Sequence, residues 1–159
     1  MSCGIVLKLG VLKKWVLLGL ALGALIACVP AGCAGGDEPS QEEYVSKLNA
    51  MCEDFSSREQ EIGEPQTPAD LVEKGPRILD AFEIAIANKI GALDAPDEIA
   101  DRADRLTDIA DQQRKVLGGL VDAAKNGDFA EVRRLASKNE ALNKESSSIA
   151  RELGADACT

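Results

Sequence analysis

Hydrophobic residues recur three and four positions apart along four successive segments between Ser40 and Gly154, which is the periodicity of amphipathic helices. Segments containing Gly63, Pro96 and Gly127 separate them. Four amphipathic helices joined by short turns predict an all-α, up-down-up-down four-helix bundle over residues 40–159. The four apolar stripes are Val45, Leu48, Cys52, Phe55 and Ile62; Leu71, Ile78, Leu79, Phe82, Ile86, Ile90 and Leu93; Ile99, Ala103, Leu106, Ala110, Gln113, Leu117, Leu120 and Ala124; and Val132, Leu135, Asn139, Leu142, Ser146, Ile149 and Leu153.

Local signals mark the starts of these helices. Ser40 followed by Glu43 predicts a capping box at the first helix. Thr67-Pro68 opens the second helix with proline in the first turn, where its missing N–H is harmless. Asp128 is the expected cap of the fourth helix. The dipeptide Gly75-Pro76 interrupts the second stripe without changing its phase, so we expect a kink there rather than a new direction.

The N-terminal segment has a different pattern. Residues 1–36 carry only three charges, all lysines, and an apolar run from Trp15 to Ala27 follows the pair Lys13-Lys14. A basic stretch followed by a short apolar stretch is typical of an export signal. The alternative is a retained transmembrane anchor over residues 15–36. Both interpretations place the C-terminal part outside the cytoplasmic membrane.

The end of this segment resembles a bacterial lipoprotein signal. Leu25-Ile26-Ala27-Cys28 is similar to a lipobox, in which the cysteine thiol receives a diacylglycerol and a peptidase cuts just before that cysteine. Pro30-Ala31-Gly32-Cys33 is a second candidate, with proline where leucine is expected. We favour Cys28, which divides the chain into a signal peptide (1–27), a lipidated cysteine with a flexible tether (28–39) and the helical domain (40–159).

Charge excludes several functions. The whole chain has a net charge of −9. Removal of the signal takes away three of the 18 basic residues, which leaves 15 basic and 27 acidic residues and a net charge of −12. Such a surface repels nucleic acid, so we expect no nucleic-acid partner. The expected partner is the lipid bilayer, which the chain contacts through the diacylglyceryl anchor. The sequence contains no histidine, which removes Ser-His-Asp and Cys-His catalysis and the usual di-iron bundle site. We therefore expect no catalytic residues, no metal and no cofactor.

The remaining polar candidates have ordinary interpretations. Asp101, Asp104, Asp108 and Asp111 form an acidic row that we interpret as a solvated helix face rather than a calcium site. Glu59 lies on the first apolar stripe, and we interpret it as structural rather than catalytic. Phe55 and Phe82 fit the core, with a pocket between them as the alternative.

Two residue pairs are expected from position. Cys52 and Cys158 are the only cysteines beyond the tether, and export permits a disulfide between them. Simple matching of helix layers leaves Cys52 about 16 Å from Leu153, so either the tail turns back along the first and fourth helices or the first helix slides.

Gln113 and Asn139 fall at one level of the third and fourth helices, where two amides could satisfy each other as a buried polar pair. The alternative is that both amides face water.

A wider resemblance covers most of the predicted mature chain. The segment Glu43-Tyr44-Val45-Ser46-Lys47-Leu48-Asn49-Ala50-Met51-Cys52 is similar to the first helix of small actinobacterial lipoproteins, and Leu93-Asp-Ala-Pro96 and Leu153-Gly154…Cys158 resemble later landmarks. This resemblance implies an extracytoplasmic helical domain with a paired cysteine, and no activity. We therefore expect a non-catalytic interaction or scaffold module at the cell envelope, with an envelope protein as partner. The alternative is a weak small-ligand carrier with a pocket inside the bundle.

Overall fold

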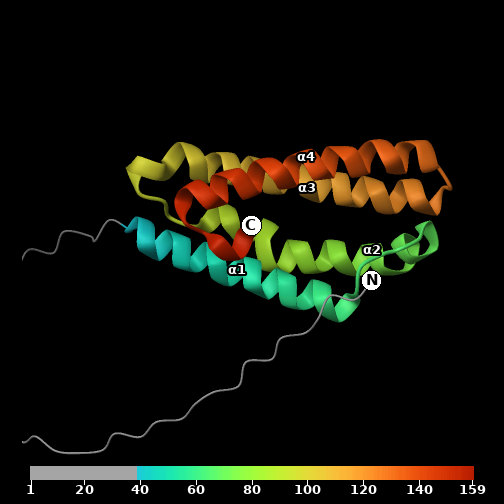
Figure 1. Cartoon of the computed structure of the whole chain (residues 1–159), viewed down its shortest axis with the longest axis horizontal. Coiled ribbons are helices and arrows are strands. Elements are labelled where there is room, and N and C mark those ends of the chain that lie inside the picture. Colours follow the sequence, from blue (N-terminus) through green and yellow to red (C-terminus); the bar gives the residue numbers. More distant parts are fainter. Residues whose placement is uncertain (1–38) are drawn as a thin grey trace, which may run out of the picture. The chain divides into compact units, whose positions relative to one another are not determined.

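The computed structural model describes residues 39–159, which form an all-α, up-down-up-down four-helix bundle, as predicted (Figure 1). The helices are α1 (Gln41–Ile62), α2 (Pro68–Phe82), α3 (Ala100–Lys125) and α4 (Phe129–Leu153). In Figure 1, α1 and α2 form one layer, and α3 and α4 form the other. A π-helix, η1 (Glu83–Ala87), and the 3-10 helices η2 (Ile90–Ala92) and η3 (Asp97–Ile99) link α2 to α3, and η4 (Asp156–Cys158) follows α4.

The helix ends follow the predicted capping chemistry. The hydroxyl of Ser40 accepts a hydrogen bond from the Glu43 N–H at 3.2 Å, and the Asp128 carboxylate accepts one from the Glu131 N–H at 3.0 Å. The Glu43 side chain pairs with Lys47 at 2.7 Å, so the reciprocal half of the Ser40 box is replaced by an ion pair. Gly63 and Gly154 end α1 and α4 with positive φ angles, which glycine adopts without strain.

Buried side chains form the core in two adjoining clusters. The larger is built around Tyr44, Phe82, Ile99 and Leu106, and the second lies between α3 and α4 around Ile109. Tyr44 is only 1% exposed, and its hydroxyl has no hydrogen-bond partner among the described residues. Burial, followed by the nearby Asp104 carboxylate, raises the pKa of Tyr44, so the phenol stays neutral and serves packing.

One side of the bundle is less closed than the others. Helix α3 packs along both α2 and α4, and α1 packs against α2. By contrast, α1 and α4 make few direct contacts, and the C-terminal turn η4 touches both of them. The two helices are therefore joined mainly through the tail, which sets the position of the site described next.

Candidate functional site

A cleft of about 360 Å³ opens between α1 and α4. This volume lies at the small end of the range, roughly 300–1,000 Å³, of small-molecule pockets. Apolar side chains from several elements dominate its walls, and polar groups stand among them. The lining residues are Leu48, Cys52, Phe55, Ser56, Glu59, Phe82, Ile86, Ile90, Leu106, Ala110, Gln113, Asn143, Ser146, Ser147, Ala150, Ala157, Cys158 and Thr159.

Two aromatic rings form part of the cleft wall. The ring centroids of Phe55 and Phe82 lie 5.6 Å apart with an interplanar angle of 82°, an edge-to-face contact. Phe82 is buried, as expected for a core residue, whereas Phe55 is half-buried. Both rings line the cleft, so an apolar group entering it meets aromatic surface from α1 and from the end of α2.

The π-helix η1 shapes the same wall. The sequence predicts one helix continuing to Leu93, but α-helical geometry ends at Phe82, and residues 83–87 take the wider π-helical turn. The prediction was wrong here because apolar spacing alone does not distinguish α from π hydrogen bonding. Ile86 within η1 lines the cleft together with Phe82 just before it. Short π-helical segments are frequent at functional sites, which is a second reason to regard this cleft as one.

The predicted pairing of Gln113 with Asn139 is wrong. The Gln113 Nε2 group donates to Asn143 Oδ1, one helical turn further along α4, and both Gln113 and Asn143 line the cleft. Gln113 and Asn139 are both half-buried rather than buried, and Asn139 Oδ1 has no hydrogen-bond partner among the described residues.

Side-chain direction explains the shift. Side chains on a helix lean toward its N-terminus. In two antiparallel helices, residues whose Cα atoms lie at the same height therefore lean in opposite directions along the axis. The residues whose side chains meet lie later in each helix. Gln113 leans away from the α3–α4 turn, and a residue on α4 must lie further from that turn to reach it. Asn143 satisfies this condition and Asn139 does not.

Glu59 lies at the edge of the cleft and is exposed rather than buried in the seam. It forms no ion pair in the part of the chain that the structure describes, and no lysine or arginine lines the cleft. Its carboxylate is therefore the charged side-chain group that a molecule in the cleft would meet first.

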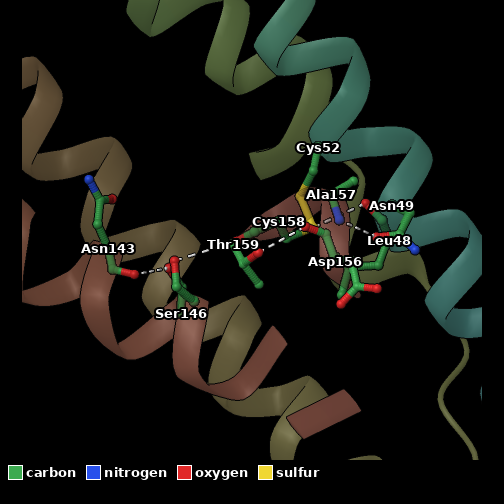
Figure 2. Close-up of a disulfide and its surroundings, with 10 residues drawn as sticks. Leu48, Asn49, Cys52, Asn143, Ser146, Asp156, Ala157, Cys158 and Thr159 are labelled. Carbon is green, nitrogen blue, oxygen red and sulfur yellow. Dashed lines mark hydrogen bonds between the residues drawn. A yellow bond between two sulfur atoms is a disulfide. The ribbon is translucent and has the colours of Figure 1, made fainter. Parts of the chain in front are cut away.

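Cys52 and Cys158, which both line the cleft, form a disulfide (Figure 2), as the sequence predicts. The two Cα atoms lie 5.3 Å apart. Gln41, at the start of α1, donates to the Leu153 carbonyl at 3.3 Å, so the end of α4 lies level with the first turn of α1. After Gly154 the tail turns back along α1, which is the first of the two routes considered from the sequence. Sequence reasoning did not foresee that this tail would also form a wall of a cleft.

The other candidates have no place in the cleft. Asp101, Asp104, Asp108 and Asp111 are all exposed on α3, and residues 39–159 contain no group of three potential metal ligands. No helix within this range is both long enough and apolar enough to cross a bilayer. The signal peptide (1–27), the lipidation candidates Cys28 and Cys33 and the tether up to residue 38 lie outside the described residues.

Comparisons of the chain with models of protein families, with curated proteins and with solved structures found no match, so the geometry of the cleft carries the functional argument.

Proposed function

We propose that this chain is a membrane-anchored extracytoplasmic lipoprotein whose helical domain is a non-catalytic binding module for a small apolar molecule. The observation that carries the proposal is the cleft between α1 and α4, with Phe55 and Phe82 in its wall. A concave, mostly apolar site with a few polar groups is the usual form of a small-molecule site. Of the two functions expected from the sequence, the ligand carrier has this support.

The groups around the cleft favour binding over catalysis. Three serines line it, but a serine nucleophile needs a neighbouring base to take its proton. The only ionisable side chain among the lining residues is Glu59, which is exposed. Ser146 donates its hydrogen bond to the Asn143 carbonyl at 3.0 Å, not to a carboxylate.

A scaffold role has less support. The large exposed hydrophobic residues in the described range are Val72, Ile84 and Phe129, which come from three different elements. A protein-binding face usually presents a larger contiguous apolar patch. An envelope protein recovered with the chain, in the absence of any ligand effect, would favour this role instead.

Thermal unfolding of the full chain in lipid nanodiscs, with a panel of small apolar molecules, tests binding. A ligand bound only by the native state raises the melting temperature. Ser146→Trp fills the cleft and should abolish this shift, whereas Ser148→Trp, on an exposed position of the same helix that does not line the cleft, should keep it. A panel without stabilisers, or stabilisation that survives Ser146→Trp, would contradict the proposal.

Mass spectrometry of the mature N-terminus tests the anchor separately. We expect a diacylglyceryl group on Cys28 and loss of processing in Cys28→Ser. A diacylglyceryl group on Cys33 would contradict the assignment of Cys28, and an uncleaved N-terminus would contradict lipoprotein processing.

A further inference from the structure

The cleft is lined by both apolar and polar side chains. Leu48, Phe82, Ile90 and Leu106 are all buried and supply apolar surface, to which the half-buried Ile86 adds. Polar lining groups come from a different set of positions, on α1, α3 and α4. A molecule that uses both surfaces must itself be amphipathic, with one apolar segment and one polar head.

The polar part is mostly uncharged. The bond from Gln113 Nε2 to Asn143 Oδ1 occupies one donor and one acceptor, leaving Gln113 Oε1 as an acceptor and Asn143 Nδ2 as a donor. Ser56 on α1 and Ser147 on α4 add hydroxyl groups. These groups suit a hydroxyl, amide or other neutral head that both donates and accepts hydrogen bonds.

The only charge among the lining side chains is negative. Glu59 stands at the edge without a cationic partner, and the domain carries a strong net negative charge. A carboxylate, sulfate or phosphate head would be repelled by Glu59 and would find no lysine or arginine in the lining. A cationic head would be attracted to the same carboxylate.

We propose that the cleft binds a single-chain amphipath with a neutral or cationic head and discriminates against an anionic head. This inference rests on the proposed binding function and specifies its ligand class. A cavity of about 150 Å³ is known to hold benzene, so about 360 Å³ has room for a chain of roughly a dozen carbon atoms. The apolar chain lies against Phe55 and Phe82, and the head lies toward Gln113, Asn143 and Glu59.

Three probes with the same decyl chain and different heads test the proposal: decan-1-ol, decyltrimethylammonium and decyl sulfate. Each is titrated, as a mole fraction of the lipid, into nanodiscs that carry the full chain with isotope-labelled methyl groups. Chemical shifts of the Leu48, Ile90 and Leu106 methyls report on occupation of the cleft, and Ser146→Trp gives the baseline for lipid effects alone. We expect decyl sulfate to bind roughly tenfold more weakly than decyltrimethylammonium, because the two heads differ by two unit charges near one exposed carboxylate.

A charge-matched pair of variants isolates the role of Glu59. Glu59→Gln should bring decyl sulfate to within about twofold of decan-1-ol. Glu61→Gln removes the same charge from an exposed position of α1 that does not line the cleft, and should leave the tenfold difference in place. Equal effects of the two variants would assign the discrimination to net charge and overturn the role of the cleft in it.

The outcomes separate this inference from the function on which it rests. If the probes bind at the cleft but decyl sulfate binds as tightly as the others, the charge discrimination is wrong and the binding function stands. If none of the three shifts the methyl signals beyond the Ser146→Trp baseline, this inference falls, while stabilisation by a small apolar molecule in the melting-temperature panel would keep the binding function.

Discussion

The side-chain oxygen of Asn49 on α1 accepts a hydrogen bond from the backbone N–H of Ala157 at 3.0 Å, across 108 positions of sequence (Figure 2). The disulfide from Cys52 to Cys158 lies directly beside it. The C-terminal turn is therefore held on α1 by one covalent bond and one hydrogen bond. Because the same turn forms a wall of the cleft, these two bonds, together with the bond that the Ser147 hydroxyl on α4 donates to the Cys158 carbonyl at 3.5 Å, help to hold that wall in place.

Asn49→Ala should loosen the turn without unfolding the bundle. The lost hydrogen bond is worth about 1 kcal/mol, which corresponds to roughly fivefold faster hydrogen exchange at the Ala157 amide. Asn49→Asp keeps an acceptor of the same shape and should retain the protection. Unchanged exchange in Asn49→Ala would show that the disulfide alone positions the turn.

Replacing both cysteines should destabilise the whole domain. The disulfide joins residues 106 positions apart, and removing a cross-link of this span frees the unfolded chain. We expect Cys52→Ala with Cys158→Ala to lower the free energy of unfolding by about 2–4 kcal/mol, measured by urea denaturation. The parent protein with reductant should follow the same curve. Two titratable thiols in the unreduced parent would contradict the disulfide itself.

Gly75 is the point of close approach between α2 and α3. A Cβ atom there would lie 2.7 Å from Val121 Cγ2 and 3.3 Å from Leu71 Cδ1. Gly75→Ala should therefore cost about 1–3 kcal/mol of stability in thermal unfolding, despite the better helix propensity of alanine.

Gly118 offers a matched control for this substitution. It lies inside α3, and its nearest neighbour would be Leu79 Cδ2 at 3.9 Å, an ordinary contact. Gly118→Ala should be neutral or stabilise the domain by up to about 1 kcal/mol. Equal changes in stability for Gly75→Ala and Gly118→Ala would show that close packing does not determine the effect of either substitution.

The helical architecture was predictable because a helix that buries one face has hydrophobic residues at regular spacing in its sequence. The stripe from Ile99 to Ala124 coincides with α3, and Asp128 caps α4 as expected. The disulfide was predictable because Cys52 and Cys158 are the only cysteines in residues 39–159.

The cleft could not be predicted from this spacing. A stripe shows which face of a helix is covered, but it does not show that α1 and α4 stay apart while α3 and α4 pack closely. The π-helical turn around Ile86 also has no local signal, since its side chains are ordinary helix residues. The partner of Gln113 depended on the direction in which side chains lean, which level matching ignores.

Asn139 is a polar residue at a position that suits an apolar one. Its amide oxygen is buried without a partner among the described residues, while it continues the stripe of Leu135 and Leu142. Asn139→Leu should therefore raise the free energy of unfolding by about 1 kcal/mol. Asn143→Leu, which removes the partner of Gln113, should give no such gain. A loss of stability in Asn139→Leu would show that its amide is satisfied by solvent in the native protein.

Acid should destabilise the start of α2 through one carboxylate. Asp70 Oδ2 accepts hydrogen bonds from the N–H groups of Gln66 and Thr67, both at 3.0 Å, and the Thr67 hydroxyl accepts one from the Asp70 N–H at 3.1 Å. The bond from Gln66, followed by the contacts with Thr67, holds the pKa of Asp70 below its ordinary value. The unfolded chain therefore takes up a proton at a higher pH than the native protein does.

The resulting stabilisation is fully present above about pH 4 and is lost as the pH falls through the lowered pKa of the native state. Asp70→Asn lacks the titrating group and should lose less stability on acidification. We expect the melting temperature of the parent to exceed that of Asp70→Asn at pH 7, and the difference to shrink steadily below pH 4. Glu73→Gln removes an exposed carboxylate of the same helix that caps nothing. This variant should show the same fall in melting temperature below pH 4 as the parent. A difference between the parent and Asp70→Asn that stays constant down to pH 2 would mean that the capping box formed by Thr67 and Asp70 does not couple folding to this proton.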